Sequence, residues 1–337
     1  MKFDAKKKQS IIMYILEKIE AGATSLSRTV AEALALSQNT VHTYLTELLS
    51  EGIIERTARG SYRLKEQQYT YRLLRSEGGL SSDTYAFTAY VLPLMKDLPE
   101  NIRRIWDYAF SEMVNNVMDH SEAECLVLHI TQSYLRTRAI LTDNGVGIFR
   151  KICDHFGFAE LDEAICELFK GKLTTDSSNH SGEGIFFTSR MMDSFAIVSD
   201  GKIFATSKFE DGALYEDTEP SKGTAVIMSL SNFTRRTAAE VFDLYTDEVG
   251  VFGKTRIPLK NVFDSAPVSR SQAKRLTHRL EQFSEVTLDF AEISWIGQGF
   301  AHQLFVVYAN ANPDVILIPI NMCEAVAKMH RHVTADR

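Results

Sequence analysis

The stretch Glu112-Met-Val-Asn-Asn-Val-Met-Asp-His120 decides how the middle of this 337-residue chain is to be understood. Most of it lies in residues 102–118, where apolar residues recur at helical spacing, so we predict a long amphipathic helix there. Glu112 and Asn116 are one helical turn apart and therefore lie on the same side of that helix. The helix thus presents a carboxylate and a carboxamide in one direction.

Three glycine-containing segments follow this helix. Strand-like residues 125–131 and 136–142 lead into the first of them, the second precedes a helical stretch, and the third precedes a strand. In order, they are Asp143-Asn-Gly-Val-Gly-Ile148, Ser181-Gly-Glu-Gly-Ile185 and Lys222-Gly-Thr-Ala-Val226. Glycine has no Cβ, so each segment allows a close approach to the backbone.

Together, the four segments resemble the N, G1, G2 and G3 boxes of the GHKL superfamily, which includes gyrase, the heat-shock chaperone ATPase, histidine kinases and the mismatch-repair protein MutL. Four matches in the family's order are far more specific than one glycine motif. The resemblance implies a GHKL-type α/β sandwich, the Bergerat fold, over residues 83–250, and it implies ATP and Mg²⁺ as ligands.

The resemblance also gives roles to four polar side chains. Asn116 would hold Mg²⁺, because a carboxamide oxygen is a neutral hard ligand. Glu112, one turn earlier, would act as the general base that polarises a water molecule. Asp143 would accept a hydrogen bond from the adenine amino group, and Thr224 would bond the same edge of the base directly or through water.

The remaining candidate nucleotide contacts are backbone groups and one lysine. The expectation is that backbone N–H groups near the glycines approach the base and the phosphates, and that the helix beginning near Ile185 points its positive end at them. A polar stretch before Ser181, with Lys170, Thr174, Thr175 and His180, falls where the family has its ATP lid. The residues expected to contact the nucleotide through their backbone, or in the case of the lysine through its side chain, are Gly145, Gly147, Ile148, Lys172, Gly182, Gly184 and Ile185.

Simpler interpretations exist for each segment alone. An Asp-Asn-Gly-Val-Gly stretch is a common turn, and Glu112 could be a solvated helix residue. Whether ATP is hydrolysed, transferred or only bound stays open, because members of the superfamily do each. Asp119, His120 and Ser121 are assigned no chemistry and are expected to shape the end of the helix.

Residues 1–66 have a different pattern. Amphipathic helices are predicted over residues 9–20, 28–34 and 38–49, with Ser25 or Ser27 capping the second and Ser37 opening the third. A strand and a hairpin with a basic tip over residues 56–64 follow. This order resembles the winged helix-turn-helix family of bacterial regulators.

In that family the second helix of the motif enters the major groove of DNA. The alternative is a protein-interaction or dimerisation module, since the same short polar residues also cap helices. The resemblance makes Gln38, Asn39, Thr40, His42 and Thr43 the candidate base contacts, and it makes Arg59 and Arg63 candidates for phosphates or the minor groove.

Residues 67–82 are interpreted as a linker, with one helix over residues 67–74. Strands and helices alternate over residues 251–337, and the stretch from Val286 to Phe300 resembles STAS-like domains related to anti-anti-sigma factors. Phosphorylated members have a Ser at the start of the helix that follows this strand. Here the corresponding stretch is Gly297-Gln-Gly299, which has no hydroxyl group that could be phosphorylated. The expected role of this region is therefore a protein-binding or sensing surface.

Composition limits the remaining possibilities. The formal net charge of -7 argues against nonspecific coating of nucleic acid, so DNA binding has to come from one local surface. The apolar stretches are too short to span a bilayer, and the four cysteines lack the spacing of a zinc site. These features predict a cytoplasmic protein without a membrane partner.

The overall expectation is an α+β multidomain bacterial regulator in which Mg·ATP controls conformation or the binding of DNA and of a protein partner. A protein kinase of the anti-sigma or histidine-kinase type is an alternative, although residues 84–102 contain no acceptor His. An ATP-driven dimerisation clamp is another. Both resembled families commonly form homodimers.

Overall fold

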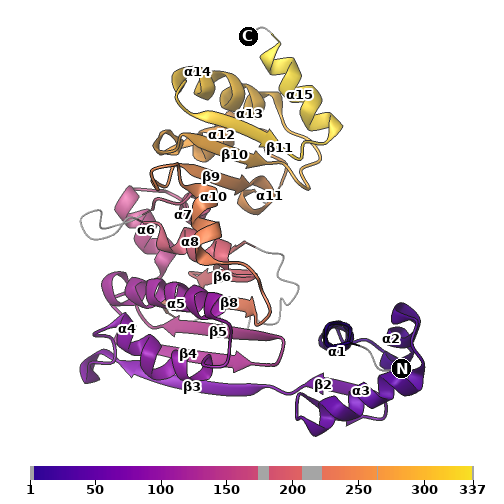
Figure 1. Ribbon diagram of the computed structural model, residues 1–337. Helices are drawn as coiled ribbons and strands as arrows, with labels where there is room; N and C mark the ends of the chain where they lie inside the picture. The colour runs from indigo at the N-terminus through magenta and orange to yellow at the C-terminus, as the bar shows by residue number, and fades with distance from the viewer. Residues whose placement is uncertain (1–3, 174–181, 207–221, 264, 336–337) are drawn as a thin grey trace. The chain divides into compact units, whose positions relative to one another are not determined.

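The computed structural model describes residues 4–173, 182–206, 222–263 and 265–335. The chain divides into two compact units. Unit 1 consists of residues 1–71, 128–139 and 229–234, and unit 2 contains the rest. Each is an assembly of helices and β-strands, which agrees with the predicted α+β class (Figure 1).

Unit 1 begins with three helices and a two-stranded antiparallel sheet. The Asp4 carboxylate accepts a hydrogen bond from Lys7 N (2.7 Å), and Ser37 Oγ accepts one from Thr40 N (3.1 Å), so a side chain caps the first and the third helix. Ser25 does not cap the second helix; its backbone is left-handed and its hydroxyl makes no cap bond. The elements are α1 (Ala5–Glu20), α2 (Leu26–Leu34), α3 (Gln38–Ser50), β1 (Ile54–Ala58) and β2 (Ser61–Leu64).

One apolar core joins these elements. Ile15, Val30 and Val41, from the three helices, are fully buried in it. Leu135, from the turn between the strands β4 (Cys125–Gln132) and β5 (Arg136–Asp143), is only 4% exposed and packs into the same core. The Arg136 guanidinium next to it forms two hydrogen bonds of 2.7 Å with the Glu20 carboxylate. Unit 1 therefore includes this turn as an integral part.

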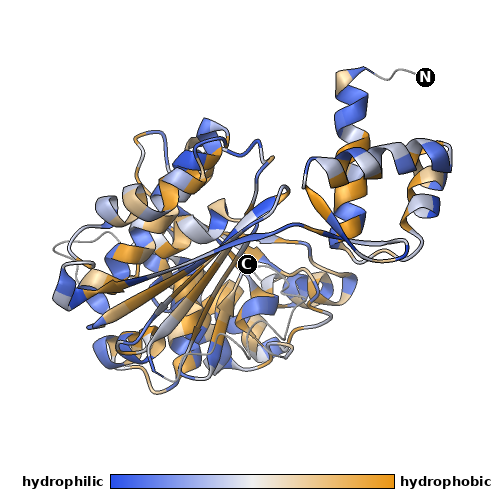
Figure 2. Cartoon of the chain, turned by 90° about the horizontal axis from the view of Figure 1, so that it is seen from below, coloured by the Kyte–Doolittle hydropathy of each residue, from blue (hydrophilic) through white to orange (hydrophobic). Residues whose placement is uncertain are grey.

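A six-stranded sheet has the strand order β3-β4-β5-β8-β6-β7 (Figure 1). The long helix α5 (Glu100–His120) packs beside α8 (Gly184–Met191). In Figure 2 the helices carry both hydrophilic and hydrophobic stretches, as expected for helices with one buried face. The strands are β3 (Gln67–Leu74), β4 (Cys125–Gln132), β5 (Arg136–Asp143), β6 (Ser194–Ser199), β7 (Lys202–Ala205) and β8 (Thr224–Ser231).

Further helical elements lie between the strands of this sheet in the chain and after its last strand. A helical segment made of α4 (Asp83–Ala86), the π-helix η2 (Phe87–Val91) and the 3-10 helix η3 (Leu92–Leu94) comes before α5, and the 3-10 helix η1 (Arg75–Glu77) follows β3. The other helices are α6 (Ile148–Phe156), α7 (Leu161–Lys170) and α10 (Ala238–Tyr245).

The C-terminal part of unit 2 is built around a three-stranded parallel sheet of order β11-β10-β9. Parallel strands need helical crossovers, and the helices between these strands supply them. The strands are β9 (Lys254–Pro258), β10 (Glu285–Asp289) and β11 (Ile316–Ile320), and the helices are α11 (Leu259–Val262), α12 (Arg270–Thr277), η4 (Leu280–Gln282), α13 (Gln298–His302), η5 (Gln303–Tyr308), α14 (Ala309–Ala311) and α15 (Glu324–Thr334).

Two predictions of local structure were wrong. Residues 67–74 form strand β3, at the edge of the six-stranded sheet, instead of a linker helix. Lys170, which was expected in the polar stretch of the ATP lid, is instead the last residue of α7 and is 1% exposed. Within the ranges that the structure describes, no helix combines the length and apolar character needed to cross a membrane.

Candidate functional site

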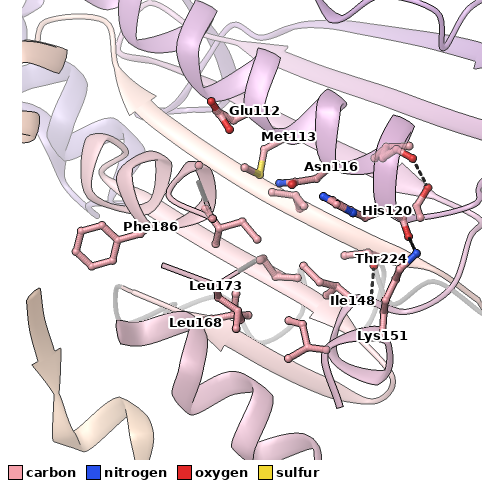
Figure 3. Close-up of a pocket in the computed structure, with 18 of the residues that line it drawn as sticks. Glu112, Met113, Asn116, His120, Ile148, Lys151, Leu168, Leu173, Phe186 and Thr224 are labelled. Atoms are coloured by element: carbon pink, nitrogen blue, oxygen red, sulfur yellow. Dashed lines mark hydrogen bonds between the residues drawn. The ribbon is translucent and has the colours of Figure 1, made fainter. Parts of the chain in front are cut away.

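A cavity of about 270 Å³ lies in unit 2, close to the lower end of the range typical of small-molecule sites. Residues from α5, β5, α6, α7, α8 and β8 surround it (Figure 3). Of the residues predicted from the sequence, the following line it: Glu112, Asn116, Asp143, Ile148, Gly182, Gly184, Ile185 and Thr224. Four segments far apart in the sequence therefore converge on one space.

Helix α5 supplies one wall. Its apolar residues, such as Ile105 and Phe110, are fully buried, so the helix has a fixed rotation. Asn116 and His120 project from successive turns toward the cavity, one and two turns beyond Glu112 (Figure 3). The wall thus offers a carboxylate, a carboxamide and an imidazole in line.

Asp143, the last residue of β5, is 5% exposed. Its Oδ1 accepts a hydrogen bond from Gly145 N (2.8 Å), and the backbone of Thr224 donates another to its carboxylate. The Thr224 hydroxyl oxygen accepts a bond from Ile148 N (3.1 Å), so its own proton remains available for donation. The site therefore combines a buried acceptor with a hydroxyl donor.

Burial raises the pKa of Asp143 from 3.8 to about 6, and the two backbone hydrogen bonds only partly oppose this. Between pH 3.8 and about pH 6, Asp143 is mostly protonated in the folded state and mostly ionised in the unfolded chain. Stability is therefore lost as pH rises through this interval. The ionised carboxylate is a destabilising group of the folded chain at neutral pH.

We expect the Asp143→Asn variant to be more stable than the wild type at pH 7, by roughly 3 kcal/mol, because asparagine carries no buried charge. The difference should fall toward zero near pH 3, below both pKa values, where Asp143 is mostly protonated in both states. Urea unfolding of both proteins at the two pH values measures it. A difference that does not change with pH would contradict the assignment.

The glycines make room for other parts of the protein, which differs from the expectation that they admit a ligand. A Cβ at Gly145 would collide with the Ser121 carbonyl, and one at Gly147 with the Asp200 carboxylate. Neither glycine lines the cavity, although Val146 between them does. At Gly184 a Cβ would collide with the Glu112 carboxylate. Gly184 therefore lets α8 pack directly against the carboxylate of α5.

The helix α8 begins at Gly184, and Gly182, Glu183 and Ile185 also line the cavity. The orphan N–H groups of its first turn lie at this edge, so the helix end is available to an anion there. Gly182 has a positive φ of 72°, and its carbonyl accepts a hydrogen bond from Leu173 N (3.0 Å). This bond fixes the edge of the cavity on both sides of residues 174–181.

Lys172 does not line the cavity, contrary to its predicted phosphate contact. Its ammonium donates to the Gln282 carbonyl (2.8 Å) and lies over the Phe252 and Phe283 rings. Burial lowers its pKa, and the charge of Glu183 opposes this. The lid residues Thr174, Thr175 and His180 lie outside the described part of the chain.

Lys151 and His120 line the cavity although no chemistry was predicted for either of them. The Lys151 ammonium donates to the His120 carbonyl (2.6 Å), at the end of α5 (Figure 3). It also lies 3.4 Å from a Glu122 oxygen. This bond ties α6 to α5. A basic residue on the first helix after a glycine-rich turn was the available signal, but nothing in the sequence paired it with α5.

In unit 1, α3 has a buried face and an exposed face. Val41, Tyr44, Leu45 and Leu48 are buried. Of the predicted base contacts, Gln38, Asn39, His42 and Thr43 are exposed and Thr40 is half-buried. Thr40 Oγ1 shares a hydrogen bond with Ser37 Oγ (2.8 Å), and Thr43 Oγ1 donates to the Asn39 carbonyl (3.1 Å). The exposed face is polar, as predicted.

The hairpin of β1 and β2 is basic. Arg59 is exposed at its turn, next to Gly60 with a positive φ of 78°. Arg63 is 70% exposed and pairs with the Glu55 carboxylate on the neighbouring strand. Arg56 stacks over the Tyr62 ring. Both predicted phosphate contacts are thus exposed, and Arg63 is held by an ion pair with a neighbouring carboxylate.

Comparisons with known families agree with part of this organisation. A family model described as a STAS-like domain of unknown function (DUF4325) matches residues 272–327, which run from α12 into α15. A model described as FaeA-like protein matches residues 7–62, which run from α1 into β2. The comparison with curated proteins gives no match. The C-terminal region is therefore similar to STAS-like domains, as the sequence predicted.

The described residues include no cluster of three or more His, Cys, Asp or Glu side chains that could hold a metal ion. A hard cation in the cavity would meet the Asn116 carboxamide and the Glu112 carboxylate, both half-buried. These are oxygen donors, which suit Mg²⁺ better than a soft metal. The donor set of the cavity is thus compatible with a magnesium ion that keeps most of its other ligands as water or phosphate.

Proposed function

We propose that this chain is a GHKL-type ATP-binding regulator that binds Mg·ATP in the cavity of unit 2. The observation that carries the proposal is the convergence of Glu112, Asn116, Asp143, Gly184 and Thr224 on that one cavity. These residues come from the four motif segments in which the sequence resembles the superfamily. Random glycine motifs would have no reason to meet around one space.

The chemistry at each end of the cavity fits a nucleotide. Asp143 and Thr224 pair a buried acceptor with a hydroxyl donor, which matches the adenine amino group and the ring nitrogen beside it. Guanine has a carbonyl oxygen where adenine has its amino group, so it would face the carboxylate with an acceptor. Glu183 and Gly184 begin a helix whose N–H groups suit phosphate oxygens.

Glu112 and Asn116 lie on the wall of α5 that leads toward α8. Asn116 would hold Mg²⁺, which when bound neutralises phosphate charge. Glu112 is placed to accept a proton from a water molecule beside the terminal phosphate, and Gly184 leaves room for its carboxylate. The same arrangement serves a protein that only binds ATP, so hydrolysis is a separate property.

The test is calorimetric titration of the full chain with ATP, with and without Mg²⁺. The wild type should bind ATP more tightly with Mg²⁺ than without it. The Asn116→Ala variant should bind with about the same affinity under both conditions, because its metal contact is missing. Asn310→Ala, at the other end of unit 2, is the control and should keep the magnesium effect. Absence of ATP binding by the wild type would refute the proposal.

We further propose that unit 1 is a winged helix-turn-helix that binds DNA through α3 and the β1–β2 hairpin. The exposed polar face of α3 and the exposed Arg59 support this. ATP binding would then control the contacts of this module or of a protein partner at the STAS-like domain. Such control requires that ATP bind two arrangements of the chain with different affinity.

Replacing Arg59 by alanine should weaken binding to a random-sequence DNA duplex and reduce the slope of log K against log salt concentration by about one. The reason is that one phosphate contact, and the counterions it releases, would be lost. Fluorescence anisotropy at several salt concentrations measures both. Arg28→Ala is the matched control, because Arg28 is an exposed arginine of α2 that pairs with Glu32. Equal effects of the two substitutions would argue against a wing contact.

A further inference from the structure

The C-terminal domain supports one wall of the cavity. Leu168, Gly171 and Leu173 line the cavity at the end of α7 and just after it. The residues between them, Lys170 and Lys172, turn their side chains the other way, onto the segment that follows α12. Residues 170–173 therefore alternate: Lys170 and Lys172 bind the C-terminal domain, and Gly171 and Leu173 line the cavity.

Lys170 anchors the first part of this wall. Its ammonium, 1% exposed, pairs with Glu167 (2.6 Å) and donates to the carbonyls of Arg275 (3.1 Å) and His278 (2.7 Å). These carbonyls belong to the last turn of α12 and to the residue that caps it, where a cation is favourable. The Lys170 carbonyl in turn accepts from Thr255 Oγ1 of β9 (2.7 Å). The end of α7 is therefore fixed to two elements of the C-terminal domain.

Lys172 anchors the second part. Its side chain donates to the Gln282 carbonyl, and its own carbonyl accepts from the Arg279 guanidinium (3.1 Å). Its φ of 55° is left-handed, which is unfavourable for a residue with a side chain. The two bonds to the C-terminal domain offset this cost. Without these two bonds, the backbone at Lys172 would lower its free energy by returning to an ordinary conformation.

A second wall has a similar support. Arg190, near the end of α8, donates to the Arg256 carbonyl of β9 (2.9 Å) and lies over the Phe186 ring, which lines the cavity. The Phe186 ring is also 4.8 Å from that of Phe252, just before β9. Both chain segments that border residues 174–181 thus rest on the C-terminal domain.

We propose that the STAS-like domain sets the nucleotide affinity of the cavity through Lys172, which acts as a positioning residue. The placement of Arg279 to Phe283 holds Lys172 in its left-handed conformation and thereby holds Leu173 in the cavity wall. A partner that displaces this segment of the C-terminal domain releases Leu173 and weakens ATP binding. By linkage, bound ATP stabilises the same segment. The inference rests on the proposed binding of ATP and names its regulation.

The experiment compares the full chain with three variants by calorimetric titration with Mg·ATP. Lys172→Met removes the bond to Gln282 and should weaken binding by about fivefold or more. Lys172→Arg keeps a donor of similar reach and should restore most of the affinity. Lys202→Met is the matched control, because Lys202 pairs with Asp162 of α7 on a half-exposed surface, and it should bind as the wild type does.

Hydrogen exchange at residues 278–285 supplies a second readout, one that a role only in folding would not change. Saturating ATP should slow hydrogen exchange at these residues in the wild type. In Lys172→Met, saturated with a higher concentration of ATP, the exchange rate should not change. Wild-type affinity in Lys172→Met, or no effect of ATP on this segment, overturns the inference while the proposed function stands. A wild type that binds no ATP overturns both. If Lys172→Met does not fold, Arg279→Gln removes the other anchor, with the same expected results.

Discussion

Replacing Asp143 by asparagine is expected to weaken ATP binding by about 100-fold, although the variant is the more stable protein. The carboxylate accepts hydrogen bonds from two backbone N–H groups. In the proposed complex it would accept a third from the adenine amino group. An asparagine side chain has one acceptor oxygen. While this oxygen serves the backbone N–H groups, the amide group would face the adenine amino group in the complex. A buried donor without a partner costs about 1–3 kcal/mol, and the charge-assisted bond is lost as well.

Calorimetric titration with ATP and GTP at pH 7 measures this effect. Asp162→Asn is the matched control, because it makes the same substitution on α7 at a surface pair with Lys202. ATP should bind this control with the wild-type affinity. Equal ATP affinity of Asp143→Asn and the wild type would remove Asp143 from the base-binding site. Greater stability together with lost affinity would identify a carboxylate that is retained for binding.

Replacing Lys170 by methionine should lower the free energy of unfolding by about 3 kcal/mol or more. The Glu167 carboxylate, 3% exposed, would lose the ammonium at 2.6 Å, and two carbonyls of α12 would lose a donor. His278 and Arg279 remain near Glu167, at 3.1 and 3.9 Å, and limit the loss. Urea unfolding at pH 7 measures the change.

The double variant Lys170→Met, Glu167→Gln separates the contributions. It removes the uncompensated charge and should recover part of the lost stability, but not all of it, because the α12 carbonyls still lack a donor. Lys202→Met removes an ion pair of the same type whose partners are about 43% and 42% exposed, and it should change the stability by less than about 1 kcal/mol. Equal losses in Lys170→Met and Lys202→Met would contradict the role of the buried pair.

Patterns local in sequence predicted much of the fold. The apolar spacing of α5, the strand that ends at Asp143 and the alternation of the C-terminal strands were all confirmed within a few residues. Strand β3 was missed although Tyr69, Tyr71 and Leu73 alternate, because its polar neighbours resemble a linker and an edge strand buries little. Edge strands carry a weak periodic signal for this reason.

The residues in and around the cavity also differ in whether local sequence patterns could predict their positions. Glu112, Asn116, Asp143 and Thr224 belong to motifs with fixed spacing, and the structure brings them together. The surroundings of Lys172 could not be predicted, because its partner Gln282 is 110 residues away and nothing local indicates that its ammonium packs against the C-terminal region. The lysine was therefore assigned to phosphate by its charge and its place in the expected lid stretch, whereas tertiary packing decides where it points.

The acidic side chain buried at the end of β5 also has a consequence for the amount of protein in a cell. An empty chain carries a destabilising charge, and a ligand at about 100 times its dissociation constant adds about 2.7 kcal/mol to the folded state. Proteases act on chains that have opened, so copies without a nucleotide would be degraded first. The supply of nucleotide would then set how long each copy survives as well as which conformation it adopts.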